Sequence, residues 1–157
     1  MSDTPSRPTQ EQLDRYADQF NQSGPMRFIG VRVSFPEGRK VLVTLPEVLP
    51  HHRGGLGTAS AINGGIIAAL FDLVLGCTPA LLDPTRRCAT LQLSMSFQRP
   101  LTGDTVTAEA EIDSYGKNTL FASARVLDSQ GNVCARAQGV VRLSTLPWAT
   151  GESPSIG

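Results

Sequence analysis

Hydrophobic and polar residues alternate with a period of two through the second half of the chain. Alternation of this kind predicts β-strands that bury one face. The inward positions are rich in alanine and glycine, which allows a helix to lie close against the sheet. Four runs show the pattern, separated by residues typical of turns: 91–97, 106–112, 120–126 and 133–141.

The first half of the chain predicts two helices and a hairpin. Residues 11–21 repeat apolar side chains at helical spacing, and Ser23-Gly24-Pro25 ends that helix. Residues 31–35 and 41–45 alternate on either side of Glu37-Gly38 and predict a β-hairpin. A loop rich in proline, histidine, arginine and glycine follows at 46–61, and then a helix over 62–75 that is apolar on every side.

We therefore expect an α+β protein in which a strongly bent antiparallel sheet of about six strands wraps around one central apolar helix. The length of 157 residues suits one domain. We expect that domain over 25–143, after an N-terminal tail and short helix at 1–24. A flexible C-terminal tail is expected at 144–157.

Composition excludes several classes of function. Fourteen basic and fourteen acidic residues cancel without a run of like charge, which argues against binding to nucleic acid or a membrane surface. No stretch reaches the eighteen or so apolar residues of a membrane span, and no signal peptide is expected. The odd number of cysteines and the adjacent His51 and His52 do not form a metal motif, so we expect free thiols, no metal and a cytoplasmic protein.

The apolar helix carries the most informative chemistry of the chain. Asp72 is its one ionisable residue, and Gly64-Gly65 opens it. Glycines at a helix start leave open N–H groups that suit a carbonyl oxygen or an oxyanion. A carboxylate in a dry place beside such a donor supplies two halves of an acyl-transfer site. The alternative is an Asp72 that caps a neighbouring loop from within a core helix.

Three motifs in this order and spacing resemble the hotdog fold and its PaaI-like acyl-CoA thioesterase family over residues 25–143. One is Asn63-Gly64-Gly65 with Asp72 seven residues further on, where the family usually has His-Gly-Gly and a carboxylate. Another is a strand that ends in Phe97-Gln98-Arg99-Pro100-Leu101 before Gly103-Asp104. The last is the pair of turns at 116–117 and 128–131 that leads into residues 135–139.

The resemblance implies roles for four residues. Asp72 would act as general base or nucleophile, and the Gly64 N–H would polarise the thioester carbonyl. Thr90 would help to position the attacking water. Alternation groups Thr90 with Gln92 on the face away from the helix, unless a bulge at the start of the strand breaks that parity. Asn63 stands where the family has histidine, and it can still accept a backbone N–H at a helix start.

The resemblance also implies a coenzyme A site without any cofactor or metal. Arginine can grip phosphate with two parallel hydrogen bonds. The stretch 53–58 departs from the family pattern, which often has a polar side chain near Gly57. Residues considered for substrate binding are Gly65, Arg86, Arg87, Arg99, Lys117 and Arg136.

One chain cannot complete this site. Gly64 and Asp72 are eight residues apart, roughly 12 Å along a helix, whereas a reacting carbonyl needs each group within about 3 Å. Two such helices running antiparallel across a twofold axis would bring Asp72 of one subunit beside Gly64 of the other. The family resemblance implies this homodimer, or a homotetramer built as a dimer of dimers. The alternative is a monomer in which Asp72 bonds a local backbone group.

Three functions are compared. Hydrolysis of an acyl-CoA thioester uses both Asp72 and Gly64. A hotdog hydratase or dehydratase commonly needs a histidine beside the carboxylate, and the helix has none. A non-catalytic module that binds acyl-CoA is left open by Asn63 and by the arginine–glycine loop.

Overall fold

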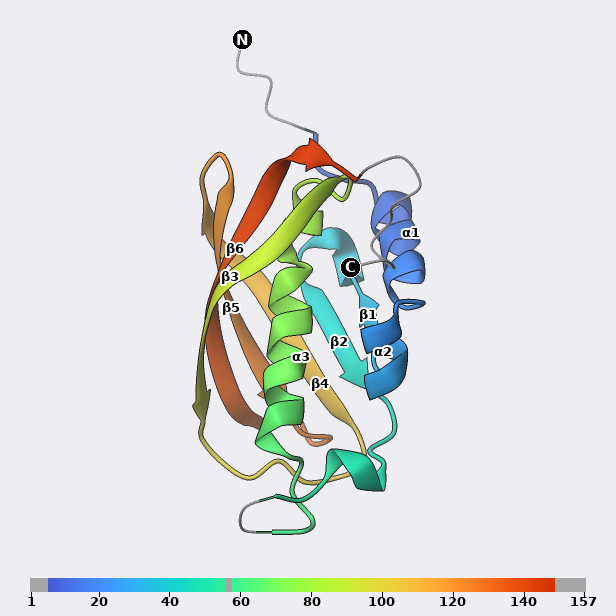
Figure 1. The fold of residues 1–157 in the computed structure, drawn as a ribbon, viewed down its shortest axis with the longest axis vertical. Helices are drawn as coiled ribbons and strands as arrows, with labels where there is room; N and C mark the ends of the chain where they lie inside the picture. Colours follow the sequence, from blue (N-terminus) through green and yellow to red (C-terminus); the bar gives the residue numbers. More distant parts are fainter. Residues whose placement is uncertain (1–5, 56–57, 149–157) are drawn as a thin grey trace.

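A six-stranded antiparallel sheet curls around one long helix in the computed structural model of the protein, which describes residues 6–55 and 58–148 (Figure 1). The predicted sheet around a central apolar helix is confirmed. The elements are α1 Gln10–Phe20, α2 Gly24–Ile29, β1 Arg32–Ser34, η1 Pro36–Gly38, β2 Val41–Leu45, η2 Pro50–His52, α3 Gly64–Gly76, η3 Thr78–Leu81, β3 Arg86–Phe97, β4 Val106–Tyr115, β5 Thr119–Leu127 and β6 Val133–Pro147.

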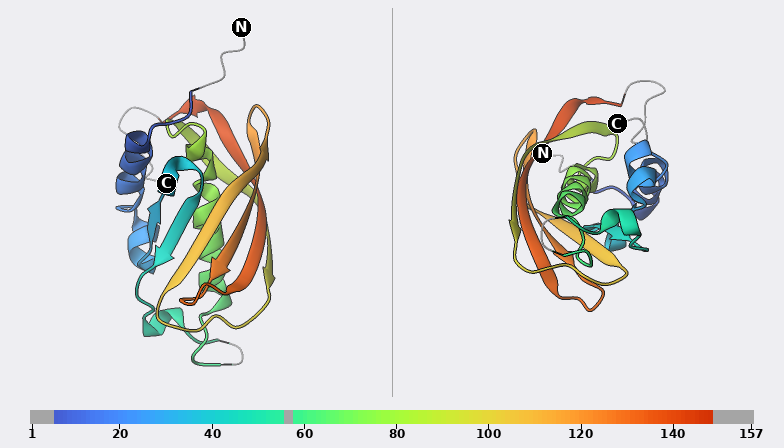
Figure 2. Two further views of the ribbon diagram at one scale, coloured as in Figure 1. Left: turned by 180° about the vertical axis from the view of Figure 1, so that it is seen from behind. Right: turned by 60° about the horizontal axis from the view of Figure 1, so that its bottom comes forward.

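The order of strands across the sheet is β1-β2-β4-β5-β6-β3, and every neighbouring pair is antiparallel. Strands β1 and β3 are therefore the two edges, and β6 joins β3 to the rest. Figure 2 shows α3 inside the curl, with α1 and α2 on the side away from β5 and β6. The sheet covers α3 on one side, and its twelve-residue edge strand β3 runs beside the helix.

The core lies between α3 and the inner face of the sheet. Leu70, Phe71, Val74 and Leu75 are fully buried there. Gly139 of β6 makes the close approach possible, because a Cβ at that position would stand 3.1 Å from Leu75 Cδ1. The small inward residues thus have the packing role that the sequence predicts.

The N-terminal part contains one helix more than the sequence predicts. The expected first helix is α1, which begins with a capping box between Thr9 and Gln12. Ser23-Gly24-Pro25 ends α1 as predicted, but the same residues also begin α2. Pro25 fits the first turn of that helix, and Gly30 ends it in the left-handed conformation with φ of 85°.

The C-terminal expectation is wrong for residues 144–148. Strand β6 continues to Pro147, whose partner in β3 is Arg86. Trp148 then donates its backbone N–H to Thr85 O and its indole N–H to Pro84 O. These contacts hold residues 144–148 in place, although apolar and polar residues no longer alternate there. The rest of the predicted tail, 149–157, and residues 1–5 lie outside the described residues.

One segment, Gly64–Leu81, is long and apolar enough for a membrane span, with a mean hydropathy of 1.8 over 18 residues, contrary to the expectation from sequence. In the fold 56% of this segment is buried. It consists of α3 and η3, and its apolar residues pack in the core. Length and composition are therefore explained by its place inside the sheet.

Candidate functional site

The side of α3 that borders β3 is open to solvent. Asn63, Gly64, Gly65 and Asp72 are all exposed. Asp72, which the sequence places in a dry setting, is therefore exposed in the single chain. The reason is that the sheet ends at the edge strand β3, next to this side of the helix.

Asn63 caps α3 and leaves one backbone donor free. Its Oδ1 accepts the Gly65 N–H at 2.8 Å, and its carbonyl accepts the N–H groups of Ile66 and Ile67 at 3.0 and 3.2 Å. Of the first four N–H groups of α3, three thus have acceptors among the described residues, and Gly64 has none. An exposed, unpaired N–H at a helix N-terminus can donate to a carbonyl oxygen. The N–H of Gly65, by contrast, is already used.

The other end of the Asn63 amide is also engaged within the chain. Asn63 Nδ2 donates to Gly54 O at 3.0 Å. Gly55 lies directly against this amide, since a Cβ there would come within 2.6 Å of Nδ2, and its φ is 120°. The backbone before α3 therefore holds the Asn63 side chain in one orientation.

A β-bulge turns Thr90 toward α3. The register of β3 on β6 shifts between Thr90 and Gln92, so that Thr90 pairs with the buried Val141 and Gln92 with Val140. A Cβ on Gly76 would stand 3.3 Å from Thr90 Oγ1. The parity break that the sequence leaves open is thus present, and Thr90 faces the helix.

Two apolar residues that the sequence predicts on the inner face of β3 are exposed. Leu91, which alternation places inward, is the extra residue at the bulge, and it is 59% exposed. Phe97 at the end of the strand is 54% exposed and lies beside Gly64, with Cε1 3.7 Å from the position of a Cβ. Apolar surface therefore borders the open side of α3 along the edge strand.

Asp72 stands between the ends of this open side. It is eight residues from Gly64, about 12 Å along the axis of α3, so the two groups of one chain do not meet at one carbonyl. Beyond Asp72, the Cys77 thiol is buried, and burial followed by the charges of Cys88 and Asp72 raises its pKa. Cys77 is thus a core residue and a poor nucleophile.

The basic residues considered for coenzyme A lie at two ends of the molecule. Arg86 donates to Ser144 O and Leu143 O of β6 and to Asn118 Oδ1, so much of its guanidinium serves the fold. Arg87 is half-buried, and Lys117 is exposed near the same end as Arg86. Arg99 is exposed at the opposite end, just after Phe97. Arg136 points to the outer face of the sheet, opposite Arg125.

The loop before α3 contains two residues whose roles the sequence pattern does not show. His52 is fully buried. Its Nδ1 accepts the Leu49 N–H at 2.9 Å, and its Nε2 lies 2.7 Å from Ile29 O. Because Nδ1 is the acceptor, the proton belongs on Nε2, and the ring is neutral. Its backbone carbonyl accepts the Asn63 N–H.

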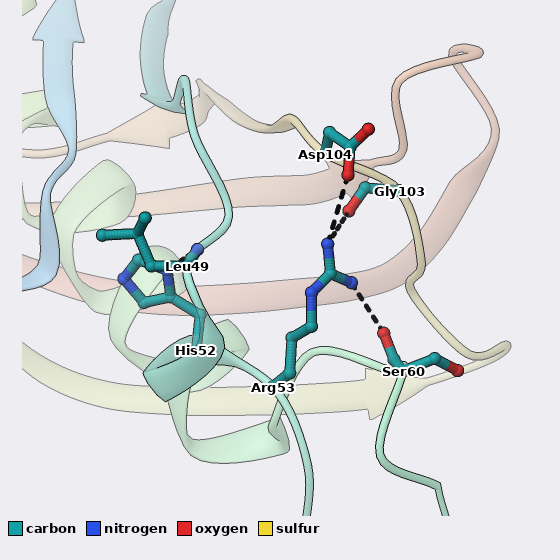
Figure 3. A network of polar contacts seen from close by, with 6 residues as sticks. All are labelled: Leu49, His52, Arg53, Ser60, Gly103 and Asp104. Atoms are coloured by element: carbon teal, nitrogen blue, oxygen red, sulfur yellow. Dashed lines mark hydrogen bonds and ion pairs between the residues drawn. The ribbon is translucent and has the colours of Figure 1, made fainter.

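Arg53 joins this loop to the connection between β3 and β4. Its guanidinium donates to Ser60 O at 2.7 Å and to Gly103 O at 2.6 Å, and it approaches Asp104 at 3.4 Å (Figure 3). The Gly103-Asp104 motif of the sequence thus supports the start of α3. Gly57, where the family pattern differs, lies outside the described residues.

Two other features do not belong to this site. Within residues 6–55 and 58–148 there is no group of three or more histidine, cysteine or acidic residues placed to hold a metal ion. A polar hollow of about 670 Å³ lies on the outer face of the sheet, away from α3. It is lined by side chains such as Lys40, Glu109, Arg125 and Arg136.

The sequence and the fold were compared with known proteins. A family model described as the thioesterase superfamily matches residues 59–135. A protein of Thermoplasma acidophilum named as a candidate esterase is 26% identical over 122 residues, which are 76% of this chain and 88% of that protein.

Two solved structures show the same fold. The Escherichia coli PaaI protein from the phenylacetic acid degradation operon has a TM-score of 0.73 at 20% identity, with 89% of this chain and 99% of that chain covered. A hypothetical thioesterase from Streptococcus pneumoniae, solved with coenzyme A, has a TM-score of 0.58 at 20% identity, covering 68% and 80%. The chain is thus similar to thioesterase-superfamily proteins over its central segment, and it has the hotdog fold of these structures.

Proposed function

We propose that the protein hydrolyses an acyl-CoA thioester to a free acid and coenzyme A. The observation that carries this proposal is the unpaired Gly64 N–H at the exposed start of α3, next to a fully used Asn63 cap. The match to the thioesterase-superfamily model and the coenzyme A complex of the Streptococcus pneumoniae structure support the same substrate class.

Asp72 supplies the attacking group in this mechanism. As general base its carboxylate takes a proton from water while the water oxygen bonds to the thioester carbon. The charge that develops on the carbonyl oxygen is stabilised by the Gly64 N–H. The tetrahedral intermediate then loses its C–S bond, and coenzyme A leaves as a thiolate that takes up a proton. Direct attack by Asp72, with an anhydride that water then hydrolyses, gives the same products.

The site is shared between two subunits in this proposal. Asp72 and Gly64 are about 12 Å apart within one chain, and both lie on the open side of α3. Edge strand β3 beside that side carries exposed Leu91 and Phe97. Long uncovered edges and apolar patches favour association. A twofold axis there pairs antiparallel helices and creates two equal sites.

The two alternatives differ in what they require. A hydratase or dehydratase needs a proton carrier near Asp72, but both ring nitrogens of His52 are engaged by backbone groups in the loop before α3. A binding module needs only a pocket for acyl-CoA and no base. Loss of Asp72 would leave its binding unchanged.

The test is a screen of short, medium, long and aromatic acyl-CoAs with the wild type and Asp72→Asn in parallel. Release of free coenzyme A by the wild type, reduced by about 10²–10⁴ in the variant, supports hydrolysis with Asp72 as base. Since Asp72 is exposed, the variant keeps the wild-type melting temperature. Acyl-CoA binding without turnover supports the binding module, and turnover unchanged in Asp72→Asn rejects the mechanism.

A further inference from the structure

We propose that Arg53 is a positioning residue that fixes the oxyanion donor Gly64 through Asn63. This inference rests on the proposed function. Arg53 does not touch the reacting atoms. It holds the backbone on which the orientation of the Asn63 side chain depends.

Two short arms of chain before α3 pair with each other. We call the arms 52–54 and 60–63 the ribbon. Arg53 and Ile62 form an antiparallel bridge, the Gly54 N–H donates to Ala61 O at 2.9 Å, and the Asn63 N–H donates to His52 O at 2.9 Å. The ribbon is bound to the rest of the fold by the Ile62 N–H, which donates to Leu101 O. A two-stranded ribbon of this length is at best marginally stable on its own.

The Arg53 guanidinium fixes the ribbon from one side. Figure 3 shows it between Ser60 of the second arm and Gly103 beyond β3. One terminal nitrogen donates to Ser60 O at 2.7 Å and the other to Gly103 O at 2.6 Å. Both acceptors are backbone carbonyls, so the guanidinium fixes the position of the backbone. It connects the two arms of the ribbon to the segment at Gly103.

The ribbon sets the Asn63 side chain. Gly54 lies between Arg53 and Gly55, and its carbonyl accepts Asn63 Nδ2 at 3.0 Å. That bond directs Oδ1 of the same amide to the Gly65 N–H at 2.8 Å. When the arms shift, Gly54 O moves, the Asn63 amide can rotate, and the cap no longer selects Gly65 over Gly64. Arg53 therefore controls whether the Gly64 N–H stays free and correctly aimed.

A lysine cannot replace this contact. The planar guanidinium presents nitrogens in a rigid fork, so two carbonyls can be bound at once in a fixed geometry. An ammonium group is a point charge on a flexible stem. The ion pair with Asp104 is the weaker part, because the Asp104 side chain is 99% exposed. The position of the ribbon thus depends on the fork and not on the charge.

The kinetic test compares Arg53→Met and Arg53→Lys with the wild type on the best acyl-CoA. The matched control is Arg125→Met, which also removes an ion-paired arginine, from the outer face of the sheet. We expect kcat to fall between about tenfold and 10²-fold in both Arg53 variants, because small displacements of a donor act on the transition state. KM stays within about twofold, and Arg125→Met keeps the wild-type rate. If Arg53 only stabilised the fold, Arg53→Met would lower the fraction of active protein, and Arg53→Lys would restore it.

A second measurement does not depend on turnover. Hydrogen–deuterium exchange is followed in peptides that cover residues 60–66, with β5 as internal reference, in the same four proteins. We expect faster exchange at 60–66 in the Arg53 variants alone. Wild-type rates in Arg53→Lys, or unchanged exchange at 60–66 in the folded variants, overturn the proposal. If Arg53→Met does not fold, Arg53→Lys decides. A wild type without thioesterase activity rejects the proposed function, and the exchange data then show separately whether Arg53 holds the ribbon.

Discussion

The Thr90 hydroxyl faces Gly76 across the junction of β3 and α3: a Cβ on Gly76 would stand 3.3 Å from Thr90 Oγ1. The bulge at Leu91 alone produces this orientation, since strict alternation would turn Thr90 to the outer face. Gly76 lies one helical turn after Asp72. The hydroxyl is thus directed toward the part of the helix that carries the proposed base.

Thr90→Val is expected to lower kcat by about tenfold without changing the melting temperature. Valine keeps the shape of threonine but would lose the hydrogen bond to the attacking water that the family resemblance implies, worth roughly 1–1.5 kcal/mol. Thr90→Ser keeps the hydroxyl and serves as the control, with a rate within about threefold of the wild type. Steady-state kinetics and thermal unfolding measure both effects. A fully active Thr90→Val would remove Thr90 from the mechanism.

Activity should return when two inactive subunits are mixed. Asp72→Asn lacks the base, and Gly64→Val covers the donor. The added side chain has room within the chain, because the nearest atom to a Cβ on Gly64 is Phe97 Cε1 at 3.7 Å. In a heterodimer one site collects both defects and the other has neither, so up to about half of the wild-type activity is expected. Heterodimers confirmed by mass spectrometry but inactive would reject the shared site.

Asn63→His should keep turnover within about tenfold of the wild type. The structure gives Asn63 two backbone partners and no proton to transfer, and a histidine nitrogen can also accept a helix N–H. The measurement is kcat across a series of pH values. A new ionisation in the kcat profile, or a change of more than 10²-fold, would show that this position takes part in the chemistry.

His52→Leu should destabilise the fold by at least about 2 kcal/mol. The substitution leaves the Leu49 N–H and Ile29 O, whose bonds to His52 are part-buried, without their side-chain partner, and each such group costs about 1–3 kcal/mol. His51→Leu is the matched control, because His51 is exposed, and its effect should stay within about 0.5 kcal/mol. Urea unfolding gives both values. Equal effects of the two substitutions would contradict the buried role of His52.

Stability should fall as the pH rises above about 9. Burial raises the pKa of Cys77 and of Tyr16 well above their ordinary values, and it also raises the pKa of Cys88. Groups with a raised pKa in the folded state give their full stability below the unfolded pKa and lose it at higher pH. Near pH 10 the unfolded thiols ionise while the folded ones stay protonated.

The measurement is the melting temperature between pH 7 and pH 10.5. Cys77→Ala removes one of the buried thiols, so its melting temperature should decline less steeply with pH than that of the wild type. The two proteins differ only at residue 77, and the difference between the two curves therefore reports Cys77. Parallel curves would show that its ionisation is not linked to unfolding.

Much of the fold follows from periodicity. The four long strands and α3 were predictable because each contains a long run of periodic or apolar residues. Helix α2 was missed because six residues give no period, and Pro25 serves equally as a stop and as a first-turn residue. The end of β6 was missed because its pairing with Arg86 and the contacts of Trp148 come from distant parts of the chain.

The site was predictable only where it is local. Asn63, Gly64 and Asp72 lie in one helix and its cap, so their spacing along the sequence gives their relative positions in space. Arg53 and His52 act on partners 50 and 23 residues away, and no spacing along the sequence indicates such contacts. The exposure of Asp72 was also not predictable, since the composition of α3 is that of a fully covered helix.

The position of β6 between β5 and β3 limits how the protein can be divided. A fragment restricted to the family match, 59–135, would end at the first residues of β6. Among the described residues β3 pairs with β6 alone, so it would lose its hydrogen-bonded partner, and the bulge that orients Thr90 would be lost with it. The ends of the family match are therefore not suitable boundaries for a truncated protein. Residues 136–147 form most of β6, the strand that joins edge strand β3 to the rest of the sheet.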